Sequence, residues 1–99
     1  MAGISALMRK RERLVRQVAG HLDFLVGSVS TKGLKYEAYN LTMTVNGVTK
    51  TRHIPIGMVP LVRRLTRRHK ELKELIKELG ETNWLLLCEG VELDAHGTV

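Results

Sequence analysis

The chain has 99 residues, 16 Lys and Arg against 10 Asp and Glu, and a formal net charge of +6 at pH 7. With 43% hydrophobic residues and two prolines, its composition is that of a globular domain with a thin core and excludes a disordered tail. Cys88 is the single cysteine, which excludes an intramolecular disulfide, and no apolar run approaches the roughly 18 residues needed to span a bilayer. We therefore expect a cytoplasmic protein with no membrane contact, no signal peptide and no cofactor.

The first predicted element is an amphipathic helix over residues 4–22. Its apolar side chains recur at helical spacing: Ile4, Leu7, Met8, Leu14, Val15, Val18, Ala19 and Leu22. Arg9, Lys10 and Arg13 occupy the opposite face. Arg11 falls inside the apolar arc, where burial without a partner is costly, so we expect the first turns to lie outside the core.

The clearest local signal is the alternation of apolar and polar residues on both sides of Asn46-Gly47. Asn and Gly tolerate the positive φ angles of a two-residue type I′ turn, so the pattern predicts a hairpin of two strands, 36–45 and 48–54. The turn type also fixes the register and places Val45 opposite Val48.

A further strand over residues 26–30 is predicted to precede the hairpin and to complete a three-stranded antiparallel sheet. One face of the hairpin is apolar, although Lys50 and Arg52 share it, with stems that cover core edges and charged heads that reach solvent. The other face is polar and carries Asn40, Thr42, Thr44, Thr49, Thr51 and His53.

The main helix is predicted over residues 58–79. Its apolar arc consists of Met58, Leu61, Val62, Leu65, Leu72, Leu75, Ile76 and Leu79. Pro60 is tolerable only in the first turn, and Gly80 is a natural stop. Residues 84–88 are too apolar for solvent and are expected to cover the core or a subunit contact, followed by a flexible tail over residues 92–99. The elements predict one α+β domain over residues 1–99: a helix, a three-stranded sheet, a long helix packed on it, and a short apolar C-terminal element.

Positive charge is concentrated in one stretch of the chain. Residues 50–70 contain seven basic residues and no acidic one: Lys50, Arg52, Arg63, Arg64, Arg67, Arg68 and Lys70. Such sorted charge attracts polyanions through phosphate neutralisation and counterion release. We therefore predict nucleic-acid binding at these seven residues, with Arg9, Lys10 and Arg13 as a second contact.

DNA is favoured over RNA because there are only four aromatic residues, and Tyr36, Tyr39 and Trp84 resemble core residues more than stacking platforms. The polar hairpin face is a candidate for base contacts, because a β-ribbon fits the major groove, Asn pairs with adenine and Thr contacts thymine methyls. The same threonines are also typical of a plain solvent-facing strand.

Metal binding and catalysis are not expected. The four histidines show no ligand spacing, and His69, within the apolar arc of the main helix, is expected to be partly buried. Cys88 is expected to be a buried small hydrophobe. No phosphate-binding loop, metalloprotease motif or nucleophile elbow is present, so we predict that the protein is not an enzyme.

Residues 24–29, the hairpin through residues 45–55 and the helix containing residues 72–75 resemble a short prokaryotic domain family of unknown function found around mobile elements. Many members carry a zinc-knuckle-type cysteine cluster between the first strand and the hairpin, but residues 31–37 contain no cysteine, so that metal site is missing. The Asn-Gly turn followed by basic residues and a helix is also similar to the small three-stranded DNA-binding domains of phage integrases.

These resemblances imply a setting in mobile genetic elements. Together with the sorted charge, they predict a small accessory or regulatory DNA-binding protein of a phage, plasmid or transposon, and we expect a homodimer because self-association would stabilise a thin core. The alternative is a protein-interaction module, such as a mobile-element inhibitor of a host nuclease or defence complex.

Overall fold

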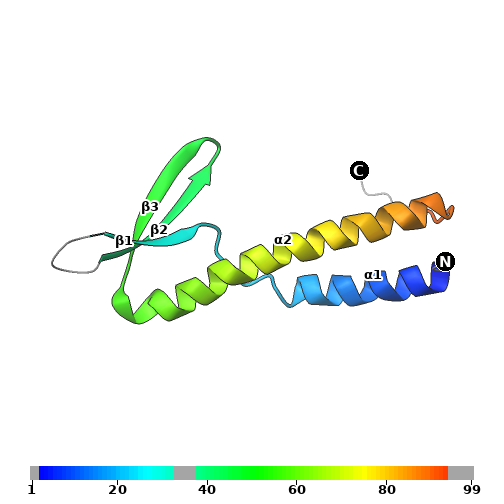
Figure 1. Ribbon diagram of the computed structural model, residues 1–99, viewed down its shortest axis with the longest axis horizontal. Coiled ribbons are helices and arrows are strands. Elements are labelled where there is room, and N and C mark those ends of the chain that lie inside the picture. The colour runs from blue at the N-terminus through cyan, green and yellow to red at the C-terminus, as the bar shows by residue number, and fades with distance from the viewer. Residues whose placement is uncertain (1–2, 33–37, 94–99) are drawn as a thin grey trace. The chain divides into compact units, whose positions relative to one another are not determined.

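The computed structural model describes residues 3–32 and 38–93 and has an α+β fold (Figure 1). Its elements in chain order are helix α1 (Ile4–Ala19), strands β1 (Ser28–Lys32), β2 (Ala38–Val45) and β3 (Val48–Ile54), the 3-10 turn η1 (Ile56–Met58) and helix α2 (Val59–Cys88). No helix within the described ranges is long and apolar enough to cross a membrane.

The chain folds into two compact units. The first comprises the residues up to Leu22 and those from Leu72 onward, and the second comprises residues 23–71. The boundary falls within α2, so the two halves of this helix belong to different units. Each unit is described below by itself.

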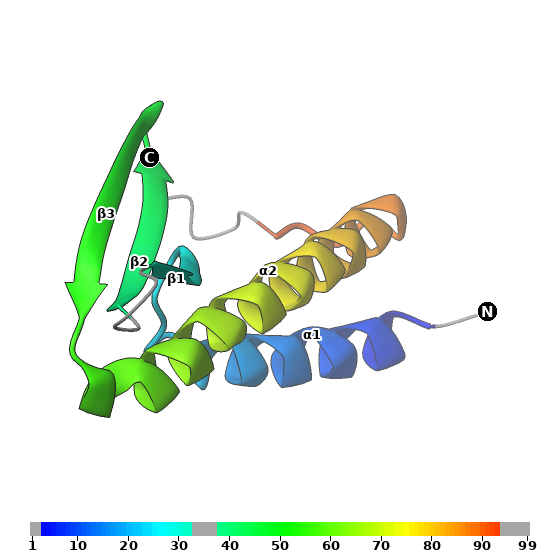
Figure 2. The same cartoon turned by 60° about the vertical axis from the view of Figure 1, so that its left-hand side comes forward.

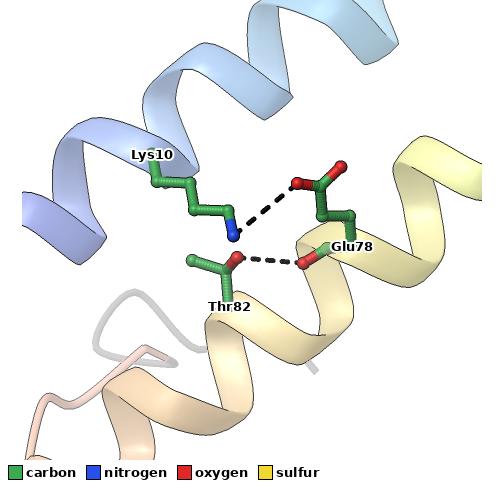
Figure 3. A network of polar contacts seen from close by, with 3 residues as sticks. All are labelled: Lys10, Glu78 and Thr82. Carbon is green, nitrogen blue, oxygen red and sulfur yellow. Dashed lines mark hydrogen bonds and ion pairs between the residues drawn. The ribbon is translucent and has the colours of Figure 1, made fainter. Parts of the chain in front are cut away.

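In the first unit, α1 runs antiparallel to the second half of α2 (Figures 1 and 2). Leu7, Leu14, Leu72 and Leu86 are buried along the seam between the helices. Thr82 is also buried, and its hydroxyl donates a hydrogen bond to the Glu78 carbonyl at 2.9 Å, so its burial leaves no unpaired polar group (Figure 3).

Two expectations for α1 were wrong. The helix ends at Ala19, three residues early, because Gly20 closes it with a hydrogen bond from its backbone N–H to the Arg16 carbonyl. The first turns lie inside the core, since Leu7 is buried. Arg11 does lie beside the seam, and its Nε donates to Asn83 Oδ1 at 3.0 Å, which offsets the cost of partial burial.

Helix α2 starts as predicted but ends later. Pro60 is its second residue, where the missing N–H costs nothing. Gly80 does not stop the helix, which continues to Cys88 and ends in a Schellman motif, with Gly90 at φ 84° and the Val91 N–H bonded to the Leu86 carbonyl.

The expected separate C-terminal element is therefore the last part of α2. Its side chains are also more exposed than predicted. Leu86 is buried, but Trp84 and Cys88 are exposed, so the predictions that they are core residues were wrong. Of the predicted tail, residues 94–99 lie outside the described ranges.

In the second unit, the sheet has the strand order β1-β2-β3 and is antiparallel throughout (Figure 2). The predicted hairpin is confirmed: Val45 pairs with Val48, and Asn46 and Gly47 have φ angles of 52° and 77°. Strand β3 has the predicted bounds. Strand β1 begins two residues later than expected, and residues 36 and 37 of the predicted second strand lie outside the described ranges.

The first half of α2 packs on the apolar face of this sheet, as predicted. The core consists of Leu41, Ile54, Val59 and Val62, with Leu25, Val29 and Tyr39 packed against it. The tip of the hairpin extends beyond this core, because Val45 and Val48 are exposed on the same face.

Candidate functional site

A groove of about 260 Å³ in the second unit is lined by one end of β1 and by the first half of α2. Its lining residues are Gly27, Ser28, Val29, Arg63, Thr66, Arg67 and Lys70. Three of the seven are cations, and none is a carboxylate.

The three cations lie on one face of α2. Arg63, Arg67 and Lys70 follow the i, i+4, i+7 spacing of neighbours on a helix surface, and all three are exposed. Within residues 3–32 and 38–93, none of them forms an ion pair, since the pairs found there join Lys10 to Glu78 and Lys77 to Glu74. The groove therefore carries uncompensated positive charge.

Arg63 is also held from the side of the sheet. Its guanidinium carbon lies 5.8 Å from the centroid of the Tyr39 ring, a cation–π distance. Beside it, the buried hydroxyl of Thr66 donates to the Arg63 carbonyl at 3.0 Å. The ring contact positions the Arg63 guanidinium without neutralising it, and the Thr66 bond gives the buried hydroxyl a partner within the helix.

The opposite wall requires a glycine. Gly27 has a φ of 133°, and a Cβ at this position would lie 2.6 Å from the Thr42 carbonyl oxygen. The backbone at Gly27 therefore lies closer to β2 than a residue with a Cβ would permit. Strand β1 is an edge of the three-stranded sheet, so it presents backbone N–H donors on its outer side.

The segment leading into this wall is tied to α2 by three contacts. The Leu25 N–H donates to the Leu65 carbonyl at 3.2 Å, and Arg68 Nη1 donates to the Asp23 carbonyl at 2.8 Å. The rings of Phe24 and His69 are stacked, with centroids 5.2 Å apart and 24° between their planes. His69 is partly buried, as the sequence predicted.

The predicted cluster of seven cations is divided by the structure. Arg64 and Arg68 lie on the adjacent face of α2, and Arg68 is engaged by the Asp23 carbonyl. Lys50 and Arg52 are on β3, the edge strand farthest from β1, where Arg52 lines a separate, mostly apolar hollow of about 200 Å³. The structure thus brings together three of the seven.

The basic residues of α1 belong to the first unit. Arg9 and Arg13 are exposed, as expected, and Arg9 Nε donates to the Ser5 carbonyl at 3.4 Å. Lys10 is partly exposed, with 40% of its side chain accessible to solvent, and its Nζ is 3.6 Å from the carboxylate of Glu78 on α2 (Figure 3). A half-exposed pair of this kind contributes little, so it reduces the charge that Lys10 offers without burying it.

The polar face of the sheet is assembled as predicted. Asn40 pairs with His53, Thr42 with Thr51 and Thr44 with Thr49, and the last two hydroxyls are 3.4 Å apart. Strand β1 adds Ser28 opposite Thr42 and Ser30 opposite Asn40. The alternation of Ser28, Val29 and Ser30 indicates that the two serines share one face of a strand. It does not indicate which residues of β2 they face.

Among the described residues, no three His, Cys, Asp or Glu side chains are close enough together to hold a metal ion. Protein-family models, curated proteins and solved structures yield no match to this chain. The family resemblances noted in the sequence therefore stay predictions.

Proposed function

We propose that this protein binds nucleic acid, DNA in preference to RNA, by contacting phosphates in the groove between β1 and α2. The observation that carries the proposal is the row formed by Arg63, Arg67 and Lys70, three exposed cations in a groove without a carboxylate. A polyanion neutralises such a row and releases condensed counterions, which favours binding.

The length of the row supports this choice of ligand. From Arg63 to Lys70 the helix rises about 10 Å, at 1.5 Å per residue, so the three charges follow one another along one direction, as the phosphates of a nucleic-acid strand do. The backbone N–H groups on the outer side of β1, the strand that lines the groove, supply uncharged donors to the same phosphates.

The polar sheet face is a candidate for reading bases within the same proposal. It carries amide, hydroxyl and imidazole groups from three adjacent strands. Asn40 has the donor and acceptor pair that recognises adenine, and the threonine methyls suit thymine. His53 and Thr51 lie in the outer rows of this face.

We assign the protein, as part of this proposal, to the cytoplasm as a non-catalytic accessory or regulatory protein of a phage, plasmid or transposon. The family resemblances support this setting. The sorted charge of the chain supports the ligand class.

The proposal is tested by fluorescence anisotropy with a labelled duplex of 20 base pairs. The double variant Arg63→Glu/Arg67→Glu is expected to lose binding by at least 100-fold at 50 mM KCl, because two attractive contacts become repulsive. The matched control is Lys73→Glu/Lys77→Glu, which changes the net charge equally on the second half of α2. Equal losses for both variants, or no binding by the wild type, would contradict a specific groove.

A protein-interaction module is the second candidate, and the exposed apolar side chains of the first unit favour it. It is distinguished by purifying the protein without nuclease treatment. A module that docks on a protein leaves duplex and single-stranded fragments unshifted and co-purifies with a protein instead of nucleic acid.

A further inference from the structure

The first unit leaves large apolar side chains of both its helices uncovered. On α2, Ile76, Trp84 and Leu87 are 52%, 60% and 51% exposed, and on α1, Ile4 and Val15 are 44% and 42% exposed. Single exposed apolar residues are ordinary, but five on two packed helices raise the question whether they form one surface.

Two polar contacts distinguish the two sides of the seam between α1 and α2. On one side, Lys10 of α1 meets Glu78 of α2. On the other side, Arg11 of α1 meets Asn83 of α2. We call the side with the Arg11–Asn83 bond the open side.

Ile4, Val15, Ile76 and Leu87 lie on the open side, Trp84 lies at its rim, and the exposed Leu85 lies on the opposite side of α2. On the helical wheel of α1, at 100° per residue, Ile4 and Val15 lie roughly 20–40° beyond Arg11, the residue that marks this side. On the helical wheel of α2, Ile76 and Leu87 lie roughly 20–40° beyond Asn83. Trp84 lies roughly 60° beyond Leu87. The two stripes therefore lie on the same side of the unit, one on each side of the Arg11–Asn83 bond.

The area of this surface fits an interface with another folded chain. From their exposed fractions, the five side chains leave on the order of 500 Å² of apolar surface in water. A standard interface buries about 800 Å² per partner, of which roughly 65% is apolar in homodimers. The uncovered surface and the apolar part of such an interface are of the same order.

Charge indicates which helices would meet. Residues 4–19 contain five basic residues and one acidic residue, whereas residues 72–88 contain two basic and three acidic residues. Packing α1 on a second α1 would place like charges side by side, whereas packing α1 on α2 of another copy pairs opposite charges.

We propose that a second copy of this chain covers the open side, so that two first units pair as four helices with α1 of each copy against α2 of the other. On each helix, the seam and the open side are roughly 90° apart, as the two neighbours of any helix in a four-helix bundle are. The contact is two-fold and self-complementary, so it closes at two copies.

Arg11 is a polar residue within the proposed interface, and its effect on self-association can be tested. It lies between the two apolar stripes with its Nε bonded to Asn83, close to where four helices would meet. A polar side chain at such a position lowers stability while fixing the register. Arg11→Leu should therefore tighten self-association, whereas a charge placed on the apolar stripe should weaken it.

The experiment is sedimentation equilibrium of the full chain between 1 and 200 µM, after removal of nucleic acid at high salt. The wild type is expected to approach twice the monomer mass, with a blue shift of the emission of Trp84, the single tryptophan, over the same range. Ile76→Glu should raise the dimer dissociation constant at least tenfold, and Arg11→Leu should lower it.

Leu85→Glu is the matched control, because Leu85 is 41% exposed on the opposite side of α2. It should leave the dissociation constant unchanged. Circular dichroism verifies that each variant is folded. A wild type that stays monomeric with unshifted emission at 200 µM overturns the proposal and leaves the open side to a different protein. Equal weakening by Leu85→Glu overturns it as well.

Discussion

Replacing Arg67 with alanine removes one of the three cations of the β1–α2 groove and, on the proposed function, one phosphate contact. Each contact contributes about −0.9 to the slope of log affinity against log salt, so three contacts give about −2.7. Affinity for duplex DNA should then fall about 40-fold between 50 and 200 mM KCl in the wild type and about 12-fold in Arg67→Ala.

The neighbouring Arg68 provides a demanding control. Its guanidinium donates to the Asp23 carbonyl at 2.8 Å and lies on the adjacent face of α2. Arg68→Ala should therefore leave the salt slope near that of the wild type and lower the free energy of unfolding by about 1 kcal/mol through the lost hydrogen bond.

Both variants are measured by anisotropy titration of one labelled duplex at four salt concentrations, with urea denaturation for stability. The reasoning fails if the two alanine variants have the same slope, because the groove would then not select among the arginines. It fails equally if the wild-type slope is flat, because phosphate contacts always release counterions.

Four further substitutions test the packing through urea denaturation. Gly27→Ala should destabilise the protein by about 3 kcal/mol, since its Cβ would meet the Thr42 carbonyl at 2.6 Å in a backbone conformation that alanine avoids. Gly80→Ala should stabilise it by about 1 kcal/mol, because this position is inside a helix with open space around the new methyl group. Leu86→Ala should cost about 3 kcal/mol, whereas Leu85→Ala should cost less than about 1 kcal/mol, since only Leu86 is buried.

The elements with local signals could be predicted from the sequence. The Asn46-Gly47 turn sets its own backbone angles and the register of both flanking strands, so β3 was predicted to the residue. The apolar periods of α1 and α2 likewise depend on residues close in sequence. By contrast, the start of β1 depends on the approach of Gly27 to Thr42, which lies in another strand and has no local signature.

The candidate site was predicted only in part, for the same reason. Arg67 and Arg68 are adjacent and identical in sequence, and nothing local indicates that one lines a groove while the other bonds to Asp23. The exposure of Trp84 could not be predicted from the sequence either, because an apolar run on a helix can face a neighbouring helix or solvent. Such distinctions depend on where distant segments pack.

Helix α2 continues through Gly80, so one helix contributes to both compact units and carries both the basic and the acidic residues. Glycine weakens a helix by about 1 kcal/mol, but tertiary packing overrides it, because Leu72 and Leu86 on either side of Gly80 are buried in the first unit. The continuous helix crosses the unit boundary after Glu71, where its basic half also gives way to the acidic one. In the acidic half, Glu78 pairs with Lys10 of α1 and Glu74 pairs with Lys77 of the same helix, so these two carboxylates have partners within the first unit. On the proposed function, the arginines of the other half keep their charge for a polyanion, and this role would account for basic residues near a helix start, where the macrodipole disfavours them.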